Sequence, residues 1–259
     1  METKYAFERH VVETSVIHFD GNSKSTWHNG THEEPQPNSL SFTQIDSCPY
    51  ATTICMDLCY VNESQDEQPE LHKIFADNYY TIRQELLPKY AQGSIAGVKS
   101  IANWIIKNSP GGFRWHNSGD VFSRTYAEFI RDVCVASSDI PHVIFTRSFP
   151  FLTPLMEAPN LAVNLSGDTA NWEQAKTMAR RTGARLTYLA HEVDLPTGLP
   201  EEGAVIFPDY ILRGRDLIDP TSKLWWQGLE LNQRKMVCPA DFFGQDEKRR
   251  CGPCNLCLT

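Results

Sequence analysis

Short apolar runs alternate with amphipathic helical segments through most of the chain. Residues 66–108 carry apolar side chains at helical spacing and predict helices that break near Pro88 and Gly93. A second helical pattern follows residue 120 and places Tyr126 and Phe129 on one face. We expect strands over residues 39–45, 112–116, 142–147, 160–165, 185–190 and 204–207, with further helices starting near Thr153 and over residues 170–181.

This alternation predicts the fold class. Strands that are nearly continuous in apolar residues and are separated by helices are typical of a parallel sheet covered by helices. Six such strands in succession favour a partial (β/α)6 barrel of the TIM type over a flat, doubly wound sheet. No G-x-G-x-x-G motif follows any of these strands, so the signature of a dinucleotide-binding fold is missing.

Polar side chains follow the predicted strands at the point where each strand ends. In a barrel of parallel strands these ends lie at one face, where the chemistry of such folds takes place. We therefore expect the candidate site at this face, built from Cys48, Ser118, Gly119, Asp120, Arg147, Ser148, Ser166, Asp168, His191 and Glu192.

Three regions follow from these patterns. Residues 1–38 form an N-terminal extension, polar and irregular apart from a strand or hairpin arm within residues 11–19. Residues 39–222 form the partial barrel. Residues 223–259 form a C-terminal tail rich in cysteine, which Trp225 and Trp226 would anchor to the barrel.

Charge and hydropathy exclude several classes of function. The 259 residues have a formal net charge of −8, and the mean hydropathy is −0.39. No apolar run approaches the roughly 18 residues of a membrane span, and no signal-peptide pattern opens the sequence, so we expect a cytoplasmic protein without membrane partners. The negative charge disfavours binding to duplex nucleic acid, except through a local patch at Lys248-Arg249-Arg250 or Arg180-Arg181.

Eight cysteines are unusual for such a chain, and they fall into groups of three, four and one. In a reducing cytoplasm they are better candidates for metal ligands than for disulfides. The lone Cys134 lies on an apolar helix face and is expected to be a buried small side chain. The group of four has the spacing C-x12-C-x2-C-x2-C, which favours an iron–sulfur cluster over a structural zinc ion, and consists of Cys238, Cys251, Cys254 and Cys257.

The group of three is Cys48, Cys55 and Cys59, with the spacing C-x6-C-x3-C. Three protein ligands leave one coordination position open, which is the general sign of a catalytic metal site. A fourth ligand from His72 or Asp57 would instead make structural zinc, and that alternative stays open.

These features together resemble the radical S-adenosylmethionine (SAM) superfamily. There, a three-cysteine loop follows the first strand of a partial barrel, as Cys48, Cys55 and Cys59 follow residues 39–45, and an aromatic residue such as Tyr60 commonly follows the last cysteine. The usual spacing is C-x3-C-x2-C, so this chain departs from it. Within the superfamily, residues 113–120 and 146–148 resemble a group of phage-encoded proteins called gene product 88, in which case the cytoplasm would be that of the host.

The resemblance implies cofactors and roles. It implies two [4Fe-4S] clusters, one on each cysteine group, and an enzyme that cleaves SAM to abstract hydrogen from a substrate. Ser118, Gly119 and Asp120 would hold the amino group of SAM, and Ser166 its ribose or carboxylate. Arg147 is suited to the carboxylate of cofactor or substrate, because a guanidinium binds carboxylates through two parallel hydrogen bonds. The substrate would be a small molecule, a nucleotide or a modified base, with a separate reducing electron donor.

Other interpretations of these residues remain. Asp120 would also serve as the N-cap of a helix starting at Val121, and Asp168 as the cap of the helix over residues 170–181. Ser166 would also fit a loop, and His116 would also fit simple packing. For the whole protein the alternative is a non-enzymatic phage regulatory protein that binds zinc or an iron–sulfur cluster.

Overall fold

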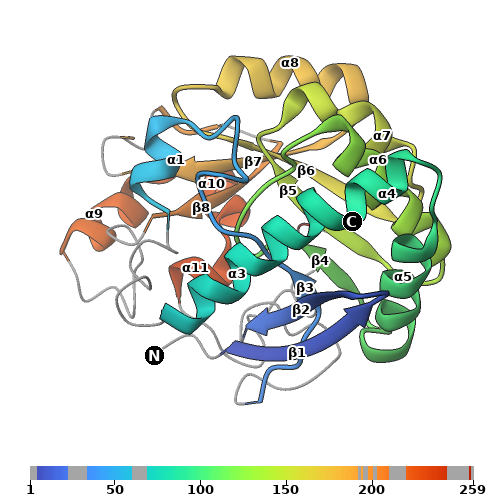
Figure 1. The fold of residues 1–259 in the computed structure, drawn as a ribbon. Helices are drawn as coiled ribbons and strands as arrows, with labels where there is room; N and C mark the ends of the chain where they lie inside the picture. Colours follow the sequence, from blue (N-terminus) through green and yellow to red (C-terminus); the bar gives the residue numbers. More distant parts are fainter. Residues whose placement is uncertain are drawn as a thin grey trace.

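The computed structural model describes residues 5–22, 34–59, 69–191, 194, 198–200, 203–209, 220–243 and 257. In this part of the chain eight strands form one sheet, and their order in the sheet is their order in the sequence (Figure 1). An antiparallel hairpin of β1 (Tyr5–Val12) and β2 (Ser15–Asn22) forms one edge, and β2 continues antiparallel to β3 (Ser39–Leu40). From β3 onward every neighbour is parallel, through β4 (Phe113–Trp115), β5 (His142–Thr146), β6 (Leu161–Gly167), β7 (Arg185–Ala190) and β8 (Ala204–Pro208).

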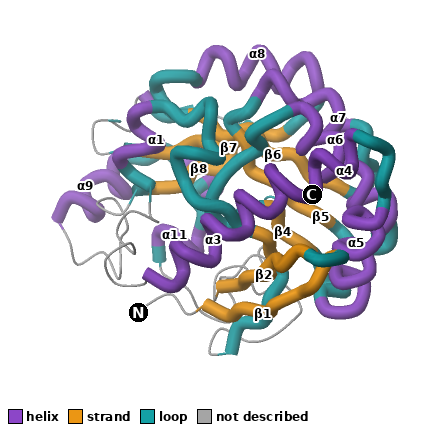
Figure 2. The backbone as a smooth tube through the Cα atoms, in the orientation of Figure 1, coloured by secondary structure: helices purple, strands orange, loops and turns teal. Residues whose placement is uncertain are grey.

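Helices fill the connections between the parallel strands, and Figure 2 shows them arranged around the strands. Between β3 and β4 lie α1 (Thr53–Asp57), α3 (Pro69–Thr81), the π-helical turn η1 (Ile82–Leu86), α4 (Leu87–Ala91) and α5 (Ala96–Asn108). Then come α6 (Arg124–Ala136), the 3-10 turn η2 (Phe149–Phe151), α7 (Leu152–Met156) and α8 (Trp172–Thr182). Three short helices follow β8, namely α9 (Pro220–Gly228), α10 (Leu231–Met236) and α11 (Pro239–Phe242).

The two faces of the sheet differ in burial. Side chains of a strand alternate between faces, and Phe113, Trp115 and Leu165 are buried in the core that includes residues of α5, α6 and α7. On the opposite face some side chains are partly exposed, whereas Val143, Asn164 and Thr187 are buried. This second face, called the inner face below, carries Arg114, Phe145, Ser166, Leu189 and Phe207.

The N-terminal extension belongs to this sheet. Phe19 on β2 is fully buried and stacks on Trp104 of α5, with ring centroids 3.5 Å apart. The expected single arm over residues 11–19 is wrong in its bounds. A turn at Glu13, with a positive φ of 56°, reverses the chain and divides that segment between β1 and β2.

The expected helix break at Pro88 is also wrong. Proline removes a backbone donor and its ring crowds the preceding turn of an α-helix. Here η1 widens the turn directly before Pro88, and the N–H of Leu87 bonds to the carbonyl of Ile82, five residues back. The helical stretch therefore continues through Pro88 and ends before Gly93, which has a φ of 94°.

The α/β class with a parallel sheet is confirmed, and a TIM-type barrel is not. The sheet stays open, because no pairing joins β8 to β1 among the described strands. In the C-terminal tail, Trp225 is buried in a second core cluster with Ile206 of β8 and Phe242 of α11, as an anchor would be. None of the described helices is long and apolar enough to cross a membrane.

Candidate functional site

The loop after β3 carries the three cysteines. Cys48 follows a tight turn, and its N–H bonds to the carbonyl of Ile45 at 3.0 Å. Cys55 lies in α1 and Cys59 just beyond its end. Burial, helped by the charges of Asp120, Cys55 and Cys59, raises the pKa of the Cys48 thiol to about 12, and a hydrogen bond with Ser47 opposes the rise. The three cysteines therefore lie on one loop, and the charges of Cys55, Cys59 and Asp120 act on the Cys48 thiol.

Ser118, Gly119 and Asp120 follow β4 and pack against this loop. Gly119 has a φ of 89°, and a Cβ added there would lie 2.7 Å from Ser47 Oγ and 2.8 Å from Phe42 Cβ. Only glycine fits such a position, because it tolerates positive φ and leaves room for the neighbouring backbone. The Ser118 carbonyl accepts the N–H of Phe42 at 2.9 Å, whereas its buried hydroxyl has no hydrogen-bond partner in the described part of the chain.

Asp120 connects the ends of two strands. Its Oδ1 accepts Thr146 Oγ1 at 2.6 Å and the N–H of Val121 at 2.7 Å, and its Oδ2 accepts the N–H of Arg147 at 2.9 Å. Burial raises the pKa of Asp120, and these hydrogen bonds oppose the rise. Asp120 is not a helix N-cap, because α6 begins at Arg124 and is capped by the hydroxyl of Ser123.

A buried ion pair joins β5 and β6 to the cysteine loop. Arg147 Nη1 lies 2.7 Å from Asp168 Oδ2, and the side chains are 7% and 1% exposed. The same carboxylate oxygen accepts Thr52 Oγ1 at 2.5 Å, and Thr52 caps α1 by accepting the N–H of Cys55 at 3.0 Å. Arg147 and Asp168 thus hold the helix that carries Cys55.

Asp168 is likewise not an N-cap. Its Oδ1 accepts the N–H of Ala170, and α8 begins at Trp172 after Asn171. Ser166 lies on the inner face of β6, where its hydroxyl accepts Thr187 Oγ1 of β7 at 3.4 Å. It therefore lies two residues before Asp168, and its hydroxyl bonds toward β7 rather than toward the ion pair.

The three thiols of this loop are its candidate metal ligands. Burial raises the pKa of Cys55, and the charge of Arg147 opposes the rise. Within the described ranges no group of three or more His, Cys, Asp or Glu side chains is arranged to hold a metal ion, and this covers zinc completed by His72 or Asp57. An iron–sulfur cluster makes a different demand, because each thiolate contacts a different iron and the sulfurs stand farther apart than around one ion. The donor type fits that demand, because three cysteine thiols of one loop act on one another through their charges.

The second cysteine group is only partly described. The N–H of Cys238 donates to the carbonyl of Ile206 on β8 at 2.7 Å. The carbonyl of Cys257 accepts Asn164 Nδ2 of β6 and Arg185 Nη1 of β7, each at 3.1 Å. Cys251 and Cys254, like Tyr60, Glu192 and Lys248-Arg249-Arg250, lie outside the described residues.

Two side chains singled out in the sequence are buried. Cys134 is fully buried on α6, as expected. His116 is 3% exposed, its Nε2 lies 2.8 Å from Tyr126 Oη, and burial lowers its pKa to about 3.

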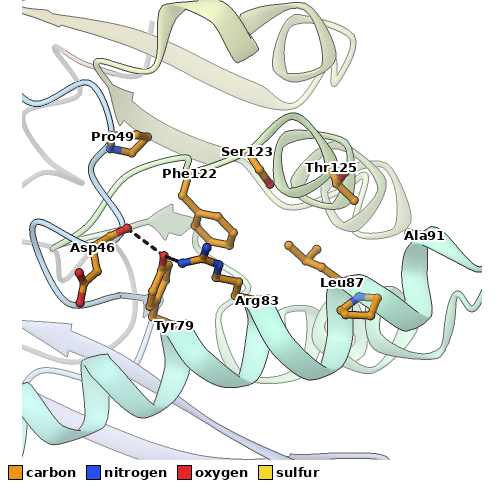
Figure 3. Close-up of a pocket in the computed structure, with 10 residues that line it drawn as sticks. Asp46, Pro49, Tyr79, Arg83, Leu87, Ala91, Phe122, Ser123 and Thr125 are labelled. Atoms are coloured by element: carbon orange, nitrogen blue, oxygen red, sulfur yellow. Dashed lines mark hydrogen bonds between the residues drawn. The ribbon is translucent and has the colours of Figure 1, made fainter.

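A cavity of about 440 Å³ lies on the other side of the cysteine loop, between α3, α4 and the start of α6 (Figure 3). Figure 3 shows how Tyr79 ties this loop to α3. Its hydroxyl donates to the carbonyl of Asp46 at 2.8 Å and accepts Arg83 Nη1 at 2.5 Å. The loop is therefore fixed from both sides.

Two functional candidates were missed in the sequence. Thr52 carries no signal beyond being a good N-cap type. Asp20 on β2 is fully buried, and it lies in a segment expected to be an irregular extension. An isolated acidic residue within an alternating strand pattern was the signal that could have found it.

Comparisons with known proteins point to one family. A family model described as Gene product 88 matches residues 16–259. The "Gene 88 protein" of Mycobacterium phage D29 is 27% identical over 204 residues, which cover 74% of this chain and 80% of that protein. No solved structure matches the chain. The expected resemblance to phage proteins of this kind is confirmed.

Proposed function

The chain belongs to the gene product 88 family, whose name states no activity, and we propose from its own residues that it is a radical SAM enzyme. The observation that carries the proposal is the convergence of Cys48, Cys55 and Cys59 with Asp120 and Arg147 at the carboxyl ends of β3, β4 and β5. In parallel α/β folds this edge of the sheet is where cofactors and substrates bind.

The curvature of the sheet supports a partial barrel. β5 and β8 are separated by β6 and β7, so in a flat sheet they would lie about 14 Å apart. The rings of Phe145 and Phe207 on these strands nevertheless meet with centroids 5.8 Å apart. The inner face is therefore concave, which is the shape that encloses a substrate beneath a cofactor.

The proposed roles of these residues are as follows. Cys48, Cys55 and Cys59 would hold a [4Fe-4S] cluster, which when bound supplies the electron that cleaves SAM for hydrogen abstraction. The Ser118 hydroxyl has no partner among the described residues and is available to a cofactor group, and Asp120 places a buried carboxylate beside it. The negative charge of the Asp120 carboxylate suits the cationic amino group of SAM.

Arg147 has a positioning role as well as a charge. Its pairing with Asp168 fixes Thr52 and hence α1, and its side chain also bonds to Cys55. The donors left over would serve a carboxylate of cofactor or substrate. Ser166 presents a hydroxyl on the same concave face. The second cysteine group, Cys238, Cys251, Cys254 and Cys257, would hold an auxiliary cluster, and a separate reductant would supply electrons.

The test is anaerobic reconstitution with iron and sulfide, followed by metal analysis and measurement of SAM binding. We expect iron and sulfide in the protein, a loss of about half of each in Cys55→Ala, and no loss in the matched control Cys134→Ala, whose thiol is buried in the core. Zinc at both cysteine groups without SAM binding would contradict the proposal and favour a non-enzymatic metal-binding protein.

A further inference from the structure

Asp20 on β2 is a buried carboxylate whose two oxygens differ in their hydrogen bonds within the described residues. Its Oδ2 accepts Ser41 Oγ at 2.8 Å and Asn117 Nδ2 at 3.0 Å. Its Oδ1 has no hydrogen-bond partner in the described part of the chain, although the residue is fully buried. A buried acceptor without a donor costs about 1 to 3 kcal/mol, and a ligand that supplies a donor would remove that cost.

The side chain points to the inner face. Phe19 faces α5, so the adjacent Asp20 faces the opposite side of the sheet. Arg114 lies between Phe113 and Trp115, both buried in the core, and shares that side. Burial raises the pKa of Asp20 to about 6, while hydrogen bonds from Asn117 and Ser41 and the charge of Arg114 oppose the rise.

Arg114 has N–H groups that make no hydrogen bond within the described residues. Its Nε donates to the carbonyl of His116 at 3.1 Å, and its guanidinium carbon lies 4.9 Å from the centroid of the Phe145 ring. Its two terminal nitrogens make no hydrogen bond within the described residues, although they carry four N–H groups. The side chains of Asp20 and Arg114 thus point to the same face of the sheet, with Asp20 fully buried and Arg114 partly exposed.

Two aromatic rings complete this surface. Phe145 and Phe207 are partly exposed and meet at 82°, with centroids 5.8 Å apart. Such rings offer faces and edges to a planar ligand. The opposite charges of Asp20 and Arg114 disfavour a ligand of either net charge at this point, and favour a neutral group that both accepts and donates.

We propose that the inner face binds a planar ring with a cyclic amide edge, the edge of a uracil-type base. The ring carbonyl accepts from Arg114, the adjacent ring N–H donates to Asp20 Oδ1, and the ring lies against Phe145 and Phe207. This inference rests on the proposed function in one respect, since the bound ring would be the substrate of that enzyme.

The test compares two ligands in the wild-type full chain by isothermal titration calorimetry. 1-Methyluracil keeps the N–H between its carbonyls, whereas 1,3-dimethyluracil has lost it. We expect saturable binding of the first and at least tenfold weaker binding of the second. Equal binding of both ligands, or no saturable binding of 1-methyluracil, overturns the proposal without any variant.

A variant pair adds the protein side. Arg114→Gln should weaken binding of 1-methyluracil at least tenfold, and Arg124→Gln, at an exposed arginine of α6, should leave binding unchanged. Thymidine and a single-stranded thymidine oligonucleotide carry the same edge. Binding of either supports the proposal, and the tighter one identifies a free or a polymer-borne base.

Failure of this inference is distinguishable from failure of the proposed function. Binding is measured without reductant, so it does not require SAM cleavage. A protein that cleaves SAM but binds neither methyluracil overturns the amide-edge site alone. A protein that binds 1-methyluracil selectively but does not cleave SAM overturns the enzymatic proposal alone.

Discussion

Replacing Asp168 by asparagine should destabilise the protein by about 3 to 5 kcal/mol, because it leaves the buried Arg147 cation without its carboxylate. The two side chains are 7% and 1% exposed and 2.7 Å apart, so water cannot take over the lost interaction. Asparagine has nearly the shape of aspartate, and its carbonyl can still accept the Thr52 hydroxyl. The substitution therefore preserves packing while it removes the charge and the oxygen that accepts the N–H of Ala170.

The assay is urea unfolding at neutral pH, with Asp139→Asn as the matched control at an exposed aspartate. Arg147→Gln and the double variant complete a double-mutant cycle, in which the double variant should be less destabilised than the sum of the two single ones. If Asp168→Asn falls within about 0.5 kcal/mol of Asp139→Asn, the two charges do not depend on each other and the reasoning is refuted.

Other positions give further predictions. Gly119→Ala should lower the free energy of unfolding by at least about 1 kcal/mol more than Gly93→Ala, because both glycines have positive φ but only Gly119 is crowded. It should also lower the amount of bound iron. Equal losses of stability in urea unfolding would contradict this. If the hairpin is part of the core, Phe19→Ala should lower the free energy of unfolding by about 3 to 5 kcal/mol. Phe7→Ala, at an exposed position of β1, should lower it by less than about 1 kcal/mol. Burial lowers the pKa of His142 to about 3, so the folded state binds fewer protons than the unfolded state between about pH 3 and 6.5, and stability falls as pH falls through that range. His142→Gln should therefore reduce the loss of stability between pH 7 and pH 5 by up to about 2 kcal/mol, and an unchanged loss would refute a buried neutral histidine.

The parallel strands could be predicted from the sequence because apolar runs between helical patterns are a local signal. The exception is the first of them, expected over residues 39–45 and found only over Ser39–Leu40. Phe42 and Thr43 bond instead to the carbonyls of Ser118 and Phe75, as the chain turns into the cysteine loop. A local pattern cannot show which distant carbonyl a backbone N–H will find.

The site could be predicted in part for the same reason. Residues that follow parallel strands share one edge of the sheet, so the proximity of Cys55, Asp120 and Arg147 follows from topology. The bond from Thr52 to Asp168 spans 116 positions in the sequence and depends on side-chain direction, which spacing does not encode. Asp20 was not predicted as a site residue, because its segment was expected to be an extension outside the sheet.

The most direct test of radical SAM chemistry is the formation of 5′-deoxyadenosine by the reconstituted, dithionite-reduced protein in the presence of SAM. The arrangement of Cys48, Cys55 and Cys59 beside Asp120 and Arg147 predicts that the wild-type protein forms this product and that Cys55→Ala does not. Absence of the product from a protein that contains iron and sulfide, or its undiminished formation by Cys55→Ala, would contradict that function for this site.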